Sequence, residues 1–340
     1  MNISDFDYHL AQDLIAQEPA RPRDSSRLLV LKREPGEVEH RRFCDLLQYL
    51  REDDLVVFND TRVIRARLRG RRVPGGGKAE VLLLADRGAG VWEALVSPGR
   101  RLPPGRQIAF GDGELRAEVL ERTEAGGRLV RFTGPAEAAE ALRRLGEIPL
   151  PPYITRPLSE ESDYQTVFAR IPGASAAPTA GLHFTPEMAE AVRSRVAAMT
   201  PVTLHIGVGT FRPVHVERVE DHDMYEERYA IPAETERLVN QALREGRRVV
   251  AIGTSTVRAL EAAAQGGQLK AVSGATDLFI LPGYQFQVAG ALLTNFHLPR
   301  STLLLLVCAF ANRELILRAY GEAVEQRYRF LSFGDAMLII

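Results

Sequence analysis

The sequence is poor in cysteine, with only Cys44 and Cys308 in 340 residues. Both lie in apolar segments, so a disulfide-bonded scaffold and a cysteine-rich metal site are excluded, and a reducing compartment is expected. Long hydrophobic runs are also missing, because the strongest one, Leu303–Phe310, is far shorter than the ~20 residues of a membrane-spanning helix. The first residues show no basic stretch followed by an apolar core, as a signal peptide would. We therefore expect a soluble, cytoplasmic protein with no membrane partner.

The chain also lacks an excess of charge of either sign. Lys and Arg total 43 and Asp and Glu total 44, so the formal net charge is −1. A nucleic-acid partner would therefore have to bind a local basic patch rather than the chain as a whole. Hydrophobic residues make up 45% of the sequence, which excludes a disordered chain. The length predicts about two domains.

Three stretches of the chain differ in residue pattern. Residues 1–61 and 151–340 contain short apolar strands that alternate with helical patterns, whereas residues 62–150 carry six strand patterns separated by glycine turns. Short, evenly spaced strands without a long helix between them are typical of a small barrel. We predict an α/β main domain formed by both chain ends, 1–61 and 151–340, with an inserted small antiparallel β-barrel domain at 62–150.

The start of the insertion carries arginines at alternate positions, Arg65, Arg67, Arg69 and Arg71. On a strand these side chains line one face. Closely spaced guanidinium groups repel one another unless anions lie among them, and RNA phosphates are one such anion. The alternative is a solvated face whose arginines pair with nearby acids such as Glu80 or Glu118. Both interpretations stay open at the level of sequence.

Three segments place a histidine beside small or polar residues at an expected strand or helix end: residues 175–184 with His183, 203–212 with His205 and 294–302 with His297. A packing role explains any one of them alone. Together they indicate proton transfer near neutral pH. His183 is the first candidate for a general base, because it directly precedes the helix cap expected at Thr185.

Other motifs allow more than one interpretation. Gly207 and Gly209 follow a strand, but the third glycine and the helix of a dinucleotide-binding loop are missing. His222 and Glu226 have a spacing that suits two metal ligands on one helix face, yet no third ligand accompanies them, so a hydrogen-bonding role is favoured over metal binding. Residues 254–258 open a helix after a strand, which suits either an anion or simple N-capping.

In their joint order these segments resemble the S-adenosylmethionine:tRNA ribosyltransferase-isomerase family of queuosine biosynthesis. The resemblance rests on five motifs, Asn59–Val63, Ala176–Phe184, Leu204–Val214, Thr294–Pro299 and Gly334–Met337. It covers essentially the whole chain. The family pattern usually has a histidine where Tyr225 stands, which questions any mechanism that needs an imidazole there.

The resemblance implies a reaction and its partners. The ribosyl group of S-adenosylmethionine is transferred to 7-aminomethyl-7-deazaguanine at the wobble position of a tRNA and isomerised, giving epoxyqueuosine and releasing adenine and methionine. S-adenosylmethionine is then the ribosyl-donor substrate, tRNA is the partner, and no metal is expected, because the sulfonium already supplies the electrophile. We expect a monomer. The family fold, a large α/β domain with an inserted barrel, agrees with the boundaries given above.

The resemblance and the chemistry together imply a set of site residues. The catalytic candidates are histidines: His183, His205, His297 and His222. The substrate-binding candidates are Asp60, Arg62, Thr179, Gly181, Gly207, Gly209, Thr210, Arg212, Glu226, Thr254, Arg258, Asn295 and Asp335. Arg65, Arg67, Arg69 and Arg71 are the candidates for tRNA binding.

Two rival functions remain at this point. One is an ordinary S-adenosylmethionine methyltransferase, against which the absence of a glycine-rich loop after an N-terminal strand argues. The other is a non-catalytic RNA-binding module, which a release of free adenine would exclude.

Overall fold

The computed structural model describes residues 1–123, 126–133, 135–207 and 216–340. The chain divides into two compact units. Unit 1 comprises Met1–Arg62, Pro152–Ile171 and Ala177–Ile340, and unit 2 comprises Val63–Pro151 and Pro172–Ala176. Both ends of the chain therefore belong to one unit, and the other is an insertion, as the sequence predicts.

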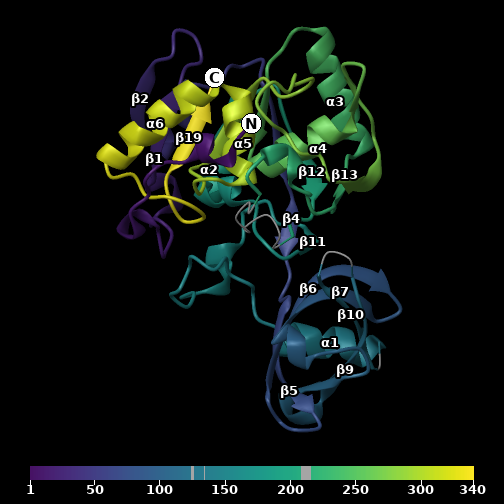
Figure 1. Cartoon of the computed structure of the whole chain (residues 1–340). Helices are drawn as coiled ribbons and strands as arrows, with labels where there is room; N and C mark the ends of the chain where they lie inside the picture. Colours follow the sequence, from purple (N-terminus) through teal and green to yellow (C-terminus); the bar gives the residue numbers. More distant parts are fainter. Residues whose placement is uncertain (124–125, 134, 208–215) are drawn as a thin grey trace. The chain divides into compact units, whose positions relative to one another are not determined.

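A mixed nine-stranded sheet forms the centre of unit 1 (Figure 1). Its strands, in spatial order, are β17 (Ser273–Thr276), β13 (Glu227–Ala230), β12 (Ala198–Leu204), β3 (Leu55–Asn59), β14 (Val249–Ile252), β18 (Ala291–Asn295), β19 (Ala336–Ile339), β1 (Arg27–Leu31) and β2 (Val38–Arg42). Strands β12, β3, β14 and β18 run parallel to one another, whereas β12 pairs antiparallel with β13 and β18 pairs antiparallel with β19. The first strand of the chain, β1, pairs parallel with the last, β19.

Helices cover both faces of this sheet, because its central strands are apolar on both sides. Strand β3 is buried at every position, the pattern typical of a central parallel strand. The helices of unit 1 are α2 (Pro186–Arg195), α3 (Ala233–Arg244), α4 (Thr254–Ala263), α5 (Thr302–Phe310) and α6 (Arg313–Glu325). One core cluster joins α2 and the 3₁₀ helix η4 (Phe43–Gln48) to alternate residues of β1, β3, β14, β18 and β19. Helices α3 and α4 contact β3, β12 and β14.

Short 3₁₀ helices and small strand pairs are the other elements in the part of the chain that the structure describes. The 3₁₀ helices are η1 (Ile3–Phe6), η2 (Gln12–Leu14), η3 (Arg23–Ser25), η5 (Gly99–Arg101), η6 (Gly111–Gly113), η7 (Glu161–Tyr164), η8 (Thr179–His183) and η10 (Val219–Asp221). Two further two-stranded sheets are formed by β4 (Thr61–Val63) with β11 (Ile171–Ala174) and by β15 (Ala264–Gln265) with β16 (Gln268–Leu269).

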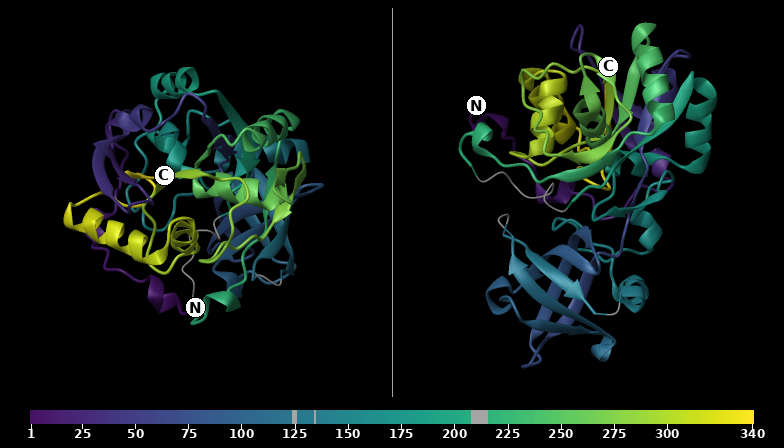
Figure 2. Two further views of the ribbon diagram at one scale, coloured as in Figure 1. Left: turned by 90° about the horizontal axis from the view of Figure 1, so that it is seen from above. Right: turned by 90° about the vertical axis from the view of Figure 1, so that its right-hand side faces the viewer.

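Unit 2 is a closed antiparallel barrel, which the right-hand view of Figure 2 shows most clearly. Its strands are β5 (Arg67–Val73), β6 (Lys78–Gly88), β7 (Val91–Ser97), β8 (Gln107–Phe110), β9 (Leu115–Arg122) and β10 (Arg128–Phe132), and α1 (Pro135–Leu145) contacts β5 and β9. Inward positions alternate with outward ones, as in Leu68 between Arg67 and Arg69. The expected fold class is confirmed in both of its parts.

The sheet order brings several strand ends together in unit 1. Strands β12, β3, β14 and β18 are parallel, so they all end at one edge of the sheet, which we call the carboxyl edge. Because β19 runs antiparallel to β18, and β1 is parallel to β19, both begin at this edge. Ligands of open α/β sheets bind at such an edge.

Candidate active site

A pocket opens at the carboxyl edge of unit 1. Its walls come from η8 and the loop before it, from the start of α4, and from the ends of β12 and β18. The lining residues are Ala177, Pro178, Thr179, Ala180, Ile206, Glu227, Gly253, Thr254, Ser255, Arg258, Thr294, Asn295, His297 and Leu303. Five of the residues predicted from sequence are among them, Thr179, Thr254, Arg258, Asn295 and His297. A second hollow shares Thr179, Asn295, His297 and Leu303 with this pocket and continues toward Tyr153 and Ser332.

Asn59 fixes the relative positions of three elements around the pocket. It is the last residue of β3 and is buried. Its Nδ2 donates to the Leu204 carbonyl of β12 (2.9 Å) and to Ser255 Oγ of α4 (3.1 Å). Its Oδ1 accepts from the backbone N–H groups of Thr61 (3.0 Å) and Leu204 (3.1 Å). Every polar atom of this buried amide thus has a hydrogen-bond partner. We call this contact between β3, β12 and α4 the Asn59 junction, and its hydrogen bonds fix how the three elements meet.

A buried ion pair stands in the pocket wall. Arg258 of α4 and Glu227 of β13 are each 4% exposed, and an Arg258 Nη1–Glu227 Oε2 contact joins them. Arg258 Nε donates to the Leu278 carbonyl (3.1 Å), and Glu227 Oε1 accepts from the Gly207 backbone N–H (2.8 Å). Arg258 Nη2 is buried and has no hydrogen-bond partner in the part of the chain that is described. A buried guanidinium nitrogen without a partner is costly, which makes Arg258 Nη2 a candidate for contact with a ligand.

A second buried polar atom without a hydrogen-bond partner in the described residues belongs to Asn295 at the end of β18. Its Nδ2 donates to the Leu331 carbonyl (3.0 Å) and to His183 Nε2 (3.2 Å). The carbonyl can only accept, which fixes the amide orientation. Asn295 Oδ1 therefore faces elsewhere, and it is buried with no partner among the described residues. This buried acceptor is a second candidate for contact with a ligand.

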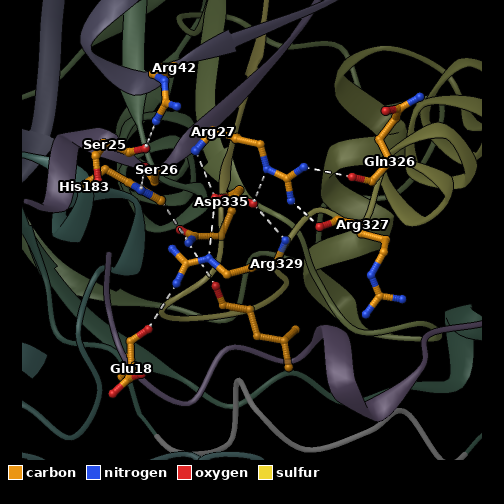
Figure 3. A network of polar contacts seen from close by, with 12 residues as sticks. Glu18, Ser25, Ser26, Arg27, Arg42, His183, Gln326, Arg327, Arg329 and Asp335 are labelled. Carbon is orange, nitrogen blue, oxygen red and sulfur yellow. Dashed lines mark hydrogen bonds and ion pairs between the residues drawn. The ribbon is translucent and has the colours of Figure 1, made fainter. Parts of the chain in front are cut away.

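His183 is hydrogen-bonded to Asn295 and to Ser26, the latter contact visible in Figure 3, and it does not line the pocket itself. Its Nδ1 lies 2.9 Å from Ser26 Oγ, and its ring stacks on Phe43. Because Nε2 accepts from Asn295, Nδ1 carries the proton and donates to Ser26. Burial lowers the pKa of His183 to about 4, although Asp335 nearby opposes the shift. Both nitrogens are engaged, so acting as a base would require one of these hydrogen bonds to break.

His297 is the histidine that lines the pocket itself. Its Nε2 lies 2.9 Å from Thr294 Oγ1, while its backbone is held by the hydroxyls of Tyr8 and Tyr320. Burial lowers its pKa to about 3, so the ring is neutral at pH 7. No residue of the described ranges is hydrogen-bonded to Nδ1, so that nitrogen is a candidate for contact with a ligand.

His205 and Asp60 form a second polar group, beside the end of β12. His205 Nδ1 lies 2.8 Å from Thr61 Oγ1, and burial lowers the pKa of this half-buried ring. Asp60 is buried, accepts from Thr203 Oγ1 (2.6 Å) and pairs with the exposed Arg170 (2.9 Å). These side chains do not line the pocket described above.

Asp335 is the hub of a network at the start of β1 and β19 (Figure 3). It is 1% exposed, and its oxygens accept from the backbone N–H groups of Arg27 (2.9 Å) and Arg329 (2.8 Å) and from Arg27 Nε (3.2 Å). Gly334 allows the tight turn before it, since a Cβ there would lie 2.5 Å from the Arg329 carbonyl oxygen. The network holds the turn against β1 and does not line the pocket.

The remaining predicted residues lie away from the pocket or outside the described ranges. Glu226 and Arg62 are exposed, and His222 packs edge-on against Phe279. Gly181 is buried in η8, where a Cβ would meet Thr166 at 3.0 Å. Gly209, Thr210 and Arg212 lie outside the residues that the structure describes. The sequence points to Glu226, but the pocket residue is its neighbour Glu227. The contact of Glu227 with Arg258 depends on how β13 pairs with β12, which no local motif reveals.

The arginines of the inserted barrel have mixed surroundings. Arg67 lies 3.7 Å from Glu80, and Arg69 lies 3.3 Å from Glu147, as the solvated alternative expects. Arg65 donates to the Arg143 carbonyl and Arg71 to the Gly76 carbonyl. A hollow on this unit is lined by basic side chains, Arg69, Arg71, Arg72, Lys78 and Arg116, with Glu80 and Asp112 as its acids.

No group of three or more His, Cys, Asp or Glu side chains among the residues that the structure describes is arranged to hold a metal ion. No helix in the described ranges is long and apolar enough to cross a membrane.

The fold and the pocket define an α/β protein with a candidate ligand pocket at the strand ends of one unit and a β-barrel as its second unit. Comparison with known proteins then identifies its family. The family model described as queuosine biosynthesis protein matches residues 3–339. The chain belongs to this family, which confirms the resemblance seen in the motifs.

Individual relatives match over their whole length. Proteins named S-adenosylmethionine:tRNA ribosyltransferase-isomerase are 53% identical over 344 residues in Moorella thermoacetica and 50% identical over 341 residues in Desulforamulus reducens, with 100% of both chains covered. A crystal structure of the S-adenosylmethionine tRNA ribosyltransferase from Thermotoga maritima is 39% identical, with a TM-score of 0.57; the match covers 99% of this chain and 100% of that one.

Proposed function

We propose that this chain is an S-adenosylmethionine:tRNA ribosyltransferase-isomerase of queuosine biosynthesis. The observation that carries the proposal is the full-length match, with the family model over residues 3–339 and relatives of that name at 50% and 53% identity. A pocket with two unpartnered buried polar atoms at the carboxyl edge of an α/β sheet supports a small-molecule substrate there.

The proposed substrates are S-adenosylmethionine, as ribosyl donor, and a tRNA that carries 7-aminomethyl-7-deazaguanine at the wobble position. The ribosyl group is transferred to the base and isomerised to an epoxycyclopentane. The products are epoxyqueuosine in the tRNA, free adenine and methionine. We expect the enzyme to act as a monomer without a metal ion, since the positive sulfur already activates the ribosyl group.

The reaction needs a base for the acidic proton beside the sulfonium, and neutral imidazoles suit this task. His297 is the best-placed candidate by geometry, because it lines the pocket and its Nδ1, unlike its Nε2, is not hydrogen-bonded to any residue that the structure describes. We assign His183 a positioning role, since its Nε2 orients the Asn295 amide. Asn295 Oδ1 then accepts a hydrogen bond from the bound substrate.

The inserted barrel offers the local basic patch that a nearly neutral chain needs for RNA. Arg71, Arg72, Lys78 and Arg116 line its hollow, and none of them forms an ion pair with a described residue. Unpaired cations on one surface are suited to phosphates. We propose that this hollow, rather than the whole arginine face, contacts the tRNA backbone.

The direct test of the proposed function is incubation of the enzyme with S-adenosylmethionine and tRNA carrying the aminomethyl-deazaguanine base. We expect free adenine in solution and a tRNA base of the mass of epoxyqueuosine. Transfer of the methyl group to the RNA would instead identify a methyltransferase, and tRNA binding without adenine release would identify an RNA-binding module. S-adenosylhomocysteine, which lacks the positive sulfur, should bind without releasing adenine.

A further inference from the structure

The wall of the pocket contains an unusual anion-binding arrangement, built around the start of α4. The N-cap of this helix is Gly253, at φ +92°, and no side chain caps the helix. The first N–H groups of an α-helix have no intrahelical partner, so the helix start carries unsatisfied donors and the positive end of the helix dipole. Thr254 and Ser255, which provide these donors, both line the pocket.

Arg258 supplies a second and independent observation at the same place. It follows Thr254 by four residues, so both lie on one face of α4. It is 4% exposed, and its Nη2 is buried and unpartnered within the described ranges. Of its other nitrogens, Nη1 contacts Glu227 and Nε donates to the Leu278 carbonyl. One guanidinium nitrogen is therefore left for a ligand at the uncapped end of the helix.

We propose that this part of the pocket binds the methionyl arm of S-adenosylmethionine, with its carboxylate on Arg258 Nη2 and on the N–H groups at the start of α4. The inference rests on the proposed function and names the end of the substrate that this subsite holds. The carboxylate is the only anionic group of that substrate. Arg258, Thr254 and Ser255 are each at most 8% exposed, so a bulky RNA backbone would reach them poorly.

The rest of the pocket suits the same ligand. Glu227, paired with Arg258, presents a carboxylate to the pocket and is complementary to an α-ammonium group. The apolar residues of the lining, Ala177, Ala180, Ile206 and Leu303, suit the methylene groups of the arm. A buried Arg–Glu pair thus matches the two charges of an amino acid.

The first experiment needs no variant. Isothermal titration calorimetry, with and without tRNA, compares S-adenosylmethionine with decarboxylated S-adenosylmethionine, which keeps the sulfonium and the amine. A charge-assisted hydrogen bond to the carboxylate predicts a roughly 10- to 100-fold weaker affinity for the decarboxylated compound. Equal affinities would overturn the subsite while leaving the proposed function intact. Failure of both compounds to bind would overturn the proposed function as well.

Two double variants, one at the pocket and one as its control, test whether Arg258 is the residue that distinguishes S-adenosylmethionine from the decarboxylated compound. Arg258→Met with Glu227→Gln removes both charges, so that no lone charge is left buried. The affinity ratio between the two ligands should then fall to about one, within a roughly two-fold margin. The matched control is Arg248→Met with Asp54→Asn, which removes another buried ion pair of unit 1, away from the pocket, and should keep the wild-type ratio.

Two outcomes would contradict the assignment. The first is a ratio that is unchanged in the Arg258 and Glu227 double variant when thermal melts show that this variant is folded. The second is a loss of tRNA affinity and of its salt dependence in that variant with no change in ligand discrimination, because that would identify the anion as an RNA phosphate. If the double variant does not fold, the wild-type comparison of the two ligands still decides the proposal.

Discussion

Neutral histidines organise the side chains around the pocket. His183 can accept from Asn295 only while its Nε2 carries no proton, and burial, which lowers its pKa to about 4, keeps it in that state. Protonation would turn Nε2 into a donor facing the donor Nδ2 of Asn295. The amide would then have to rotate, and its Oδ1 would no longer be available to the substrate.

This arrangement predicts a pH dependence of stability. His183 has a folded-state pKa of about 4, against an ordinary value of 6.5. Between these values the unfolded chain binds a proton that the folded protein does not, so stability falls as the pH drops from 6.5 toward 4 and is unaffected by this group above 6.5. Relative to His183→Gln, the wild type should lose on the order of 3 kcal/mol of unfolding free energy over this window. Urea unfolding at several pH values measures it, and a difference that does not vary with pH would refute the buried neutral state.

Substitution of His297 should change the reaction rate, whereas substitution of His183 changes the pH dependence of stability. A general base contributes about 10²–10⁴-fold to the rate, so His297→Ala should lower the single-turnover rate by that factor at saturating substrates. His297→Gln should not restore it, since an amide cannot take a proton. His222, packed against Phe279, provides the comparison: His222→Ala should reduce the rate much less. A near-normal rate in His297→Gln would move the base to His205.

Among the secondary-structure elements, the site depends on one sheet edge and on the amide that joins its elements. Asn59 connects the end of β3 to β12 and to the first turn of α4 through three hydrogen bonds, and a fourth holds the backbone of Thr61. Since α4 carries Thr254, Ser255 and Arg258, a shift of its first turn would alter the whole pocket wall.

Removing this amide should therefore affect both stability and ligand binding. Asn59→Ala leaves several buried backbone and hydroxyl groups unpaired, which costs about 1–3 kcal/mol for each group that water does not reach. We expect a lower melting temperature and weaker binding of S-adenosylmethionine. Asn240 makes a similar two-bond contact with Leu269, outside the pocket, so Asn240→Ala should reduce the melting temperature alone. Unchanged ligand affinity in a folded Asn59→Ala variant would contradict the role of the junction.

The sequence predicts the elements well because their patterns are local. Alternating apolar residues predict the barrel strands, and continuous apolar runs predict β3 and β14. Contacts between distant segments are not predicted in this way, because they depend on how the strands pair. The placement of Glu227 rather than Glu226 beside Arg258 follows from the register of β13, and the engagement of His183 by Ser26 follows from the position of β1, which pairs with the last strand. No spacing within a single segment encodes either contact.

In the molecule as a whole, a net charge of −1 conceals a local basic surface. The sequence predicts an arginine face, but the structure pairs Arg67 and Arg69 with glutamates. The hollow of unit 2 keeps Arg71, Arg72, Lys78 and Arg116 without ion pairs among the described residues. Charges that are already paired release few counterions, so the hollow is the better candidate for RNA.

A salt titration distinguishes these arginines. Arg71→Ser with Arg116→Ser should weaken tRNA binding and lower the salt slope by about 1–2 units, if each side chain meets one phosphate. Arg87→Ser with Arg144→Ser removes the same charge from the same unit, yet both arginines already pair with glutamates, so its effect should be smaller. Affinity for S-adenosylmethionine should be unchanged in both. Equal slopes in the two double variants would indicate a general effect of charge instead of a binding surface.

Isotope tracing tests the central claim, ribosyl transfer to tRNA, most directly. S-adenosylmethionine labelled either in the ribose or in the methyl group is incubated with the enzyme and tRNA carrying the aminomethyl-deazaguanine base. The tRNA is then digested to nucleosides, and their masses are measured by mass spectrometry. The account predicts that the modified nucleoside carries the complete ribose label and none of the methyl label, with free adenine formed in equal amount. A nucleoside that carries the methyl label, or one that carries no label at all, would contradict it.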